Sequence, residues 1–192
     1  MNNLEPVIDN FRELPKIASK VNYRIAIANN QMTPSRGLIA EATRYANEHQ
    51  ISLDVFINAS NESNIFDDTE AKIMEADLFQ CQSLGTDGVI IGALTSENQI
   101  DTEIMEALAG ASDGMEMFFS PAFDEIPENN WDEALSWLTE HQFSGIVASQ
   151  NLQKLEQKLK EFNTLRLVPY LTTEEASQPE NQTDSFIYIN KK

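Results

Sequence analysis

The side chains best suited to chemistry in this chain are carboxylates, amides and hydroxyls that stand in or near short apolar segments. Such groups bind neutral or cationic ligands, and the carboxylates of Glu5, Asp124 and Glu125, if they converge, could bind a cation or share a proton. Acids in loops are usually solvated, which is the simpler explanation for them. The candidate ligand-binding residues are Glu5, Asn58, Ser60, Ser120, Asp124 and Ser149.

Three sulfur-containing side chains are candidate ligands of a soft metal ion, because such ions prefer thiolates and thioethers. Cys81, the only cysteine, shares an apolar helical stripe with Met74 and Leu78, which favours a buried structural role. Met115 and Met117 are two residues apart, so a strand would place both thioethers on one face. Core packing explains this pair more simply than a metal does. These side chains do not make a complete metal-ligand set.

Nucleophilic catalysis lacks a general base in this sequence. Ser35 and Ser149 have no histidine near them in the expected fold, because His49 and His141 both end helical segments that precede strands. In a barrel of parallel strands that position lies opposite the usual site. We therefore expect no Ser-His-Asp arrangement, name no catalytic residue and favour a protein that is not an enzyme.

The segment Gly85–Asp101 shows how the chain positions its polar groups. Residues 89–94 are apolar without alternation and rich in β-branched residues, as in a strand covered on both faces. A helical pattern precedes this strand, Gly85 suits a helix C-cap, and Asp101 can cap the next helix. The same αβ unit recurs along the chain. The predicted strands are Leu4–Asp9, Arg24–Asn29, Leu53–Asn58, Gly88–Leu94, Glu116–Pro121, Gly145–Ser149, Arg166–Leu171 and Ser185–Asn190.

Helical patterns fill most intervals between the predicted strands. The second of them has Thr33 as its expected N-cap and Pro34 at its first position. Residues 171–184 have little apolar content, so we expect a loop there with one helical turn around 174–177, and no helix after the eighth strand. The other predicted helices begin near Leu14 or span Glu70–Leu84, Asp101–Ala109, Trp131–His141 and Leu152–Phe162.

Strands that alternate with helices predict an α/β fold with a parallel sheet. Eight such strands predict one domain over residues 1–192, a reduced (β/α)8 TIM barrel whose last helices are short or missing. An open, doubly wound sheet is the alternative, but no glycine-rich phosphate-binding loop supports it. Functional sites of such barrels lie at the C-terminal ends of the strands.

The chain is strongly acidic, with 31 acidic and 13 basic residues and a net charge of −18. Such a surface repels phosphate backbones and anionic lipids, so we expect no nucleic-acid partner and no membrane binding. No apolar run reaches transmembrane length, and the N-terminus lacks signal-peptide features, which predicts a cytoplasmic protein. The acidity favours solubility over a specific cationic partner as its explanation.

Three blocks in collinear order resemble the CutC copper homeostasis proteins, which are TIM barrels. Residues 33–37, Thr-Pro-Ser-Arg-Gly, are similar to that family's T-P-S-x-G after its second strand. Residues 70–101 resemble its fourth-strand block, and residues 119–124, Phe-Ser-Pro-Ala-Phe-Asp, resemble its F-H-R-A-F-D. The order and spacing agree from about residue 4 to residue 150. The resemblance implies a TIM barrel, a role in copper homeostasis and copper as a candidate cofactor, for which Cys81, Met115 and Met117 are the candidate ligands.

The sequence departs from this family where a barrel site is expected. The family's I-R-P-R-G-G-D-F after the third strand reads here as residues 57–64, Ile-Asn-Ala-Ser-Asn-Glu-Ser-Asn, without either arginine. The histidine and arginine of its fifth-strand motif are replaced by Ser120 and Pro121. Arginine and histidine bind anions and transfer protons, whereas the replacing residues supply neither a cation nor a titratable base. We therefore expect the family's small-molecule site to be lost or repurposed.

Three functions follow from these observations. The resemblance implies a copper homeostasis protein, which the lost groups would make non-catalytic. The first alternative is a barrel that binds a small neutral or cationic ligand at the mouth formed by the C-terminal ends of the strands. The second is a structural subunit of a homo-oligomer, expected to be a dimer. A missing last helix would expose apolar barrel wall near the eighth strand, which a partner chain could cover.

Overall fold

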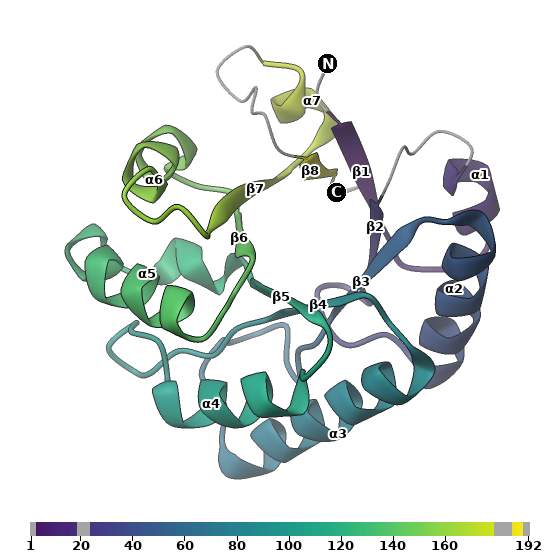
Figure 1. The fold of residues 1–192 in the computed structure, drawn as a ribbon, viewed down its shortest axis with the longest axis horizontal. Coiled ribbons are helices and arrows are strands. Elements are labelled where there is room, and N and C mark those ends of the chain that lie inside the picture. The colour runs from purple at the N-terminus through teal and green to yellow at the C-terminus, as the bar shows by residue number, and fades with distance from the viewer. Residues whose placement is uncertain (1–2, 19–23, 179–185, 190–192) are drawn as a thin grey trace.

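The computed structural model describes residues 3–18, 24–178 and 186–189. Eight parallel strands form a closed barrel in sequence order, with helices around it (Figure 1). The ring closes where β1 pairs with β8, with Leu4 opposite Ile187 and Glu5 opposite Tyr188. The predicted (β/α)8 barrel is confirmed, and the open sheet is excluded. The strands are β1 (Asn3–Ile8), β2 (Arg24–Ile27), β3 (Ser52–Phe56), β4 (Gly88–Ile91), β5 (Glu116–Phe119), β6 (Gly145–Ala148), β7 (Arg166–Leu171) and β8 (Phe186–Ile189).

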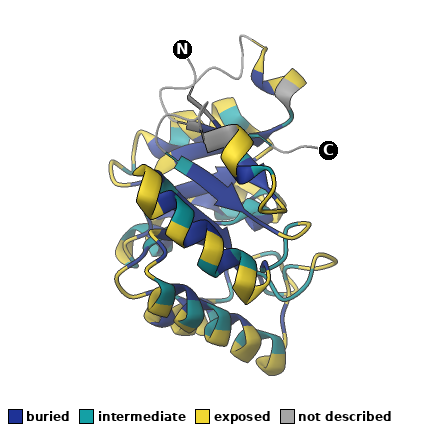
Figure 2. Ribbon diagram, turned by 90° about the vertical axis from the view of Figure 1, so that its right-hand side faces the viewer, coloured by how far each residue is buried: buried dark blue, intermediate teal, exposed yellow. Residues whose placement is uncertain are grey.

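The helices cover the outside of the barrel, with exposed residues on their outer sides and buried strands beneath them (Figure 2). The last helix in the described part of the chain, α7, has four residues, so the prediction of a short final helix is correct. The helices are α1 (Leu14–Ala18), α2 (Arg36–His49), α3 (Asp68–Leu84), α4 (Thr102–Ala111), α5 (Trp131–Glu140), α6 (Leu152–Leu159) and α7 (Thr173–Ala176), and the 3-10 helices are η1 (Pro121–Glu125) and η2 (Glu128–Asn130).

The helix caps agree with the sequence in two places and differ in one. Gly85 ends α3 with φ of 76°, and Asp101 accepts a hydrogen bond from the backbone N–H of Ile104 at 3.1 Å. Helix α2, however, is capped by Ser35 instead of Thr33. The Thr33 hydroxyl accepts a hydrogen bond from the backbone N–H of Asn58 at 3.0 Å. Thr33 therefore fastens the loop after β2 to the end of β3.

The core has two layers, because side chains alternate between the two faces of each strand. One layer fills the barrel and includes Ala26, Phe56, Ile90, Phe118 and Val168. The other lies between the strands and the helices. Burial of one large apolar side chain contributes about 1.5–3 kcal/mol, so both layers stabilise the ring. The strands are apolar without alternation because they are covered on both faces.

The outer wall near β8 differs from the sequence expectation. Ile187 of β8 is fully buried and packs in a cluster with Leu171 of β7 and Ala176 of α7. The single turn of α7 thus covers the described outward-facing part of β8, and the predicted exposed wall is wrong at this position. Among the residues whose burial the structure describes, the exposed large apolar side chains lie elsewhere, at Phe11, Ile65, Ile73 and Phe79. None of the helices in the described part of the chain has the length and apolar character needed to cross a membrane.

Candidate functional site

A pocket of about 200 Å³ opens at the C-terminal ends of the strands. Phe56 and Ile90 from the barrel interior contribute to its apolar part, together with Ile57, Gly92, Pro121 and Ala122. Its polar groups are amides, one hydroxyl and two carboxylates, and none of the lining residues in the described ranges is basic. Such a lining offers hydrogen bonds and negative charge to a ligand. The polar residues that line it are Gln31, Asn58, Asn64, Ser120, Asp124, Glu125 and Gln150.

Asp124 connects η1 to the end of β6. Its carboxylate accepts hydrogen bonds from the backbone N–H of Ser149 at 2.9 Å, from the Ser149 hydroxyl at 2.6 Å and from the backbone N–H of Gln150 at 3.1 Å. Burial raises the pKa of Asp124 above its ordinary value, although these hydrogen bonds oppose the shift. Asp124 therefore lines the pocket and also positions its wall, while Ser149 acts through Asp124.

Glu125 and Asn64 meet across the pocket. The side-chain amide of Asn64, from the loop between β3 and α3, donates a hydrogen bond to the Glu125 carboxylate at 2.7 Å. The backbone carbonyl of Asn64 also accepts a hydrogen bond from the N–H of Leu94 at 2.8 Å. Two loops are thus joined beside the carboxylate that has the fewest protein partners in this pocket. Glu125 is accordingly the pocket group most able to contact a cation.

Ser120 depends on a glycine for its place in the pocket. A Cβ atom built on Gly92 would lie 2.2 Å from the Ser120 Oγ, which is far inside van der Waals contact. The same Oγ accepts a hydrogen bond from the backbone N–H of Ala122 at 3.3 Å and so begins η1. Gly92 and Ser120 together shape the wall that carries Asp124 and Glu125.

Three predicted ligand residues do not line the pocket: Ser149, which contacts Asp124 from behind it, Ser60 and Glu5. Ser60 takes part in a turn in which its N–H donates to the Asn58 side chain at 3.2 Å and its hydroxyl accepts from the N–H of Glu62. Glu5 is buried on β1, opposite Tyr188 of β8, and does not line the pocket. The expected convergence of Glu5 with Asp124 and Glu125 is therefore wrong. The described residues contain no group of three His, Cys, Asp or Glu side chains able to hold a metal ion.

Sequence reasoning missed Gln31, Asn64 and Gln150 as pocket residues. Gln31 follows β2 with a positive φ of 64°, a conformation that the sequence alone does not reveal. Asn64 lies eight residues beyond the end of β3, in a loop whose path is set by its hydrogen bond to Leu94. Gln150 directly follows Ser149 and could have been found from its position after β6.

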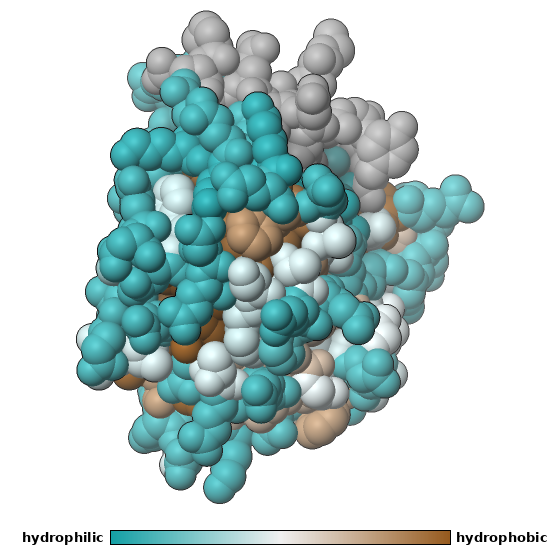
Figure 3. All heavy atoms as spheres, turned by 60° about the vertical axis from the view of Figure 1, so that its left-hand side comes forward, coloured by the Kyte–Doolittle hydropathy of each residue, from teal (hydrophilic) through white to brown (hydrophobic). Residues whose placement is uncertain are grey.

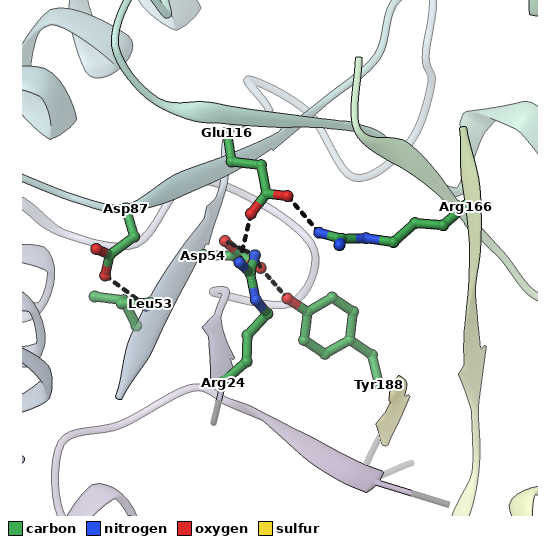
Figure 4. Close-up of polar contacts among 7 residues, drawn as sticks. All are labelled: Arg24, Leu53, Asp54, Asp87, Glu116, Arg166 and Tyr188. Carbon is green, nitrogen blue, oxygen red and sulfur yellow. Dashed lines mark hydrogen bonds and ion pairs between the residues drawn. The ribbon is translucent and has the colours of Figure 1, made fainter. Parts of the chain in front are cut away.

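Two arginines of the barrel interior lie at the opposite end, where β2 and β7 begin (Figure 4). Arg24 donates two hydrogen bonds to Asp54, at 2.8 and 2.7 Å, and also pairs with Glu116, which pairs in turn with Arg166. The Tyr188 hydroxyl donates to Asp54. We call these five side chains the ion-pair network.

The ion-pair network closes the amino-terminal end of the barrel. Asp54 is completely buried, and both guanidinium groups lie over the Phe118 ring, at 5.3 and 5.0 Å from its centroid. Burial opposes ionisation of Glu116, but Arg24 and Arg166 outweigh it and lower the pKa of this carboxyl. These arginines are thus committed to structural ion pairs far from the candidate ligand groups.

The candidate copper ligands belong to the packed outer layer. Cys81 is fully buried on α3, and burial raises the pKa of its thiol to about 12, although a hydrogen bond with Thr86 opposes the shift. Met115 and Met117 both pack against the outer core, as their spacing predicts. A buried thiol that stays protonated at neutral pH is a poor Cu(I) ligand, because the thiolate is the coordinating form. The described sulfur groups therefore do not fit a Cu(I) site.

Both histidines are held at helix C-termini. Nδ1 of His49 and of His141 lies 2.8 Å from the carbonyl oxygen of Tyr45 and of Trp137, respectively. Each imidazole also stacks on the ring of that same aromatic residue, with centroids 3.9 and 3.8 Å apart. These contacts give both histidines a structural role, and neither lines the mouth pocket.

Comparisons with known proteins agree with this architecture. A model of the CutC family matches residues 3–169. The CutC proteins of Enterococcus faecalis and Streptococcus pyogenes are 33% and 32% identical over 143 residues, which cover 72% of this chain and 68% of each relative. A CutC structure from Streptococcus agalactiae has a TM-score of 0.87 and 27% identity over 98% of both chains.

A more distant structure shares the fold alone: KD(P)GA from T. tenax has a TM-score of 0.64 and 16% identity over 98% of this chain and 69% of that one. The family match, by contrast, extends over most of the chain and is accompanied by relatives above 30% identity. The resemblance read from the three sequence blocks is thereby confirmed. The chain belongs to the CutC family.

Proposed function

We propose that this CutC protein binds a small polar ligand, neutral or cationic, in the pocket at the C-terminal ends of its strands. One observation carries the proposal: the polar side chains of the described pocket lining are amides, a hydroxyl and carboxylates, without a basic group. An anion would meet Asp124 and Glu125 there with no cation to compensate them. An ammonium group could instead pair with Glu125 and donate hydrogen bonds to the oxygens of the surrounding amides.

The pocket supports binding more than catalysis. Ser149 does not line this pocket, and the one base that its hydroxyl is shown to contact, the Asp124 carboxylate, is already held by two backbone N–H groups. General acid–base chemistry would require Asp124 or Glu125 to act alone. We therefore propose a binding protein without a catalytic cycle.

The name of the S. agalactiae relative refers to copper homeostasis, and we propose a role in copper homeostasis for this chain as a second function. The burial of Cys81 and its raised pKa argue against a thiolate site within one chain. A contribution of this chain to copper homeostasis would then act through its ligand instead of through tight Cu(I) coordination. A homo-oligomer and a cytoplasmic location stay predictions from the sequence.

Thermal unfolding with three matched probes tests the proposed function. Ethanolammonium and acetamide represent cationic and neutral ligands, and inorganic phosphate represents anions. We expect the cation to raise the Tm most, acetamide to raise it less, and phosphate to have no effect. Glu125→Gln should abolish the preference for the cation, whereas Glu140→Gln, which removes a charge at the end of α5, should preserve it. A rise in Tm with phosphate that exceeds the rise with ethanolammonium would refute the proposal.

A further inference from the structure

A second cavity, of about 380 Å³, lies outside the barrel between α4 and α5. It is larger than the mouth pocket and is within the size range of small-molecule sites, about 300–1,000 Å³. Ile100, Ile126, Ala134 and Trp137 give it an apolar surface. The loop from Thr95 to Asp101 closes one side, and α5 closes the other. We call this cavity the α4–α5 groove.

Carboxylates surround the apolar surface of the groove. Asp101, Glu103 and Glu133 all line it, and none of its lining residues in the described ranges is basic. Asp101 is engaged in capping α4, but Glu103 and Glu133 are exposed and form no ion pair within the described part of the chain. Two carboxylates are thus available to a ligand at the rim of an apolar cavity.

Trp137 gives the groove an aromatic surface in a fixed position. One face of its ring is covered by His141, with centroids 3.8 Å apart and planes at 16°, and Phe143 lies 6.1 Å away. The half-buried indole lines the groove with its remaining surface. Indole rings attract cations through their quadrupole more strongly than other aromatic side chains do. The aromatic surface and the carboxylates therefore favour the same kind of ligand.

We propose that the α4–α5 groove binds a small organic ammonium ion with an apolar body, such as an aryl- or alkylamine. The apolar body would contact Trp137 and Ile126, and the ammonium group would lie near Glu133 and Glu103. This site is separate from the mouth pocket, with which it shares no lining residue.

The charge of the chain argues for a cation over other occupants. With a net charge of −18, the molecule repels anions and attracts cations from solution. A second copy of the chain would bring equally acidic surfaces together at the rim of the groove, which costs energy unless a cation compensates them. Hydrophilic side chains dominate the face that carries α5 and α6, and the hydrophobic side chains on this face form small, separate areas (Figure 3). That surface has the character of a solvent-facing wall more than of a broad protein interface.

Titration followed by the indole N–H resonances in NMR tests the groove directly. The chain has two tryptophans, so the Trp137 signal is identified with the Trp137→Phe variant. The probe is phenethylammonium, and phenethyl alcohol and 3-phenylpropanoate are its neutral and anionic counterparts. We expect saturable shifts of the Trp137 signal with phenethylammonium, much weaker binding of the alcohol, and none of the anion.

Charge variants assign the binding to the groove. Glu133→Gln and Glu103→Gln should each weaken phenethylammonium binding about two- to fivefold, as for a partly exposed ion pair, and salt should weaken it further. Glu140→Gln changes the net charge equally but lies outside the groove and should leave the affinity unchanged. Glu125→Gln should also leave it unchanged, which separates this site from the proposed mouth function.

Three outcomes would overturn the inference. The first is equal affinity for phenethyl alcohol and phenethylammonium, which would show an apolar cavity without cation selectivity. The second is a loss of affinity in Glu125→Gln that equals the loss in Glu133→Gln, which would place the probe at the barrel mouth. The third is broadening of the Trp137 signal with protein concentration alone, which would show that a second copy of the chain occupies the groove.

Discussion

The ion-pair network makes Arg24→Met a strongly destabilising substitution. The Arg24 side chain is 14% exposed and makes two hydrogen bonds to the fully buried carboxylate of Asp54. Methionine fills the space of the aliphatic stem but leaves Asp54 without its cation. Removal of one partner from a buried ion pair costs about 3–5 kcal/mol. For a chain of this size, each kcal/mol lowers the Tm by about 2–4 °C, so we expect a fall of about 6–20 °C.

Arg44→Met is the matched control for this experiment. Arg44 also pairs with two carboxylates, those of Glu41 and Glu48, but its side chain is 59% exposed on α2. Such surface pairs contribute about 0–1 kcal/mol. Urea unfolding of both variants, followed by circular dichroism at neutral pH, gives the two free energies. The double variant with Asp54→Asn should recover part of the Arg24→Met loss, because it removes the unpaired charge.

The reasoning fails if Arg24→Met costs no more than Arg44→Met. That result would mean that water reaches Asp54 and replaces the guanidinium, so the barrel end would not be closed by the ion-pair network. The same variant should keep the ligand response of the mouth pocket, since neither Arg24 nor Asp54 lines that pocket.

Three further predictions follow from the mouth and from the outer core. Gly92→Ala should lower the free energy of unfolding in urea by about 1–3 kcal/mol, because its Cβ would overlap the Ser120 Oγ. A second change, Ser120→Ala, should restore part of the loss. Equal stability of Gly92→Ala and wild type would contradict this geometry. Burial raises the pKa of Asp124, so its contribution to stability is fully present below the ordinary carboxyl pKa of about 4 and is lost as the pH rises through the folded pKa. Asp124→Asn should therefore flatten the fall in stability above about pH 4, and an unchanged slope would count against the shift. Cys81→Ser should leave Cu(I) affinity in a competition assay unchanged, because burial keeps the thiol protonated, and a large loss of affinity would revive the copper site.

The sequence was sufficient for the architecture because burial on both faces leaves a pattern in each strand. Residues 89–91 are apolar at every position, and in the structure all of them are buried. Gly85 and Asp101 mark the ends of the neighbouring helices by local chemistry that does not depend on the rest of the fold. The low apolar content of residues 171–184 likewise predicted that the helix there, α7, would be short.

The details of the site depended on contacts that no local pattern records. Glu5 was expected at the mouth, but strand register places it opposite Tyr188, inside the barrel. The ion-pair network joins residues of five strands, and its contact between Tyr188 and Asp54 links positions 134 residues apart in sequence. Threonine is a common helix N-cap, but the Thr33 hydroxyl accepts a hydrogen bond from the backbone N–H of Asn58, and Ser35 caps the helix instead. In each case a tertiary contact determined the outcome over the local preference.

The central proposal is that the barrel mouth, whose described lining has no basic side chain, favours cations and neutral ligands over anions. The side-chain amide resonances of Asn58, Asn64 and Gln150 report on this pocket in NMR. Titration of the wild-type protein with ethanolammonium and, separately, with inorganic phosphate is the most direct measurement. The account predicts saturable shifts of these three signals with ethanolammonium and none with phosphate. Saturable shifts with phosphate, and none with ethanolammonium, would contradict it.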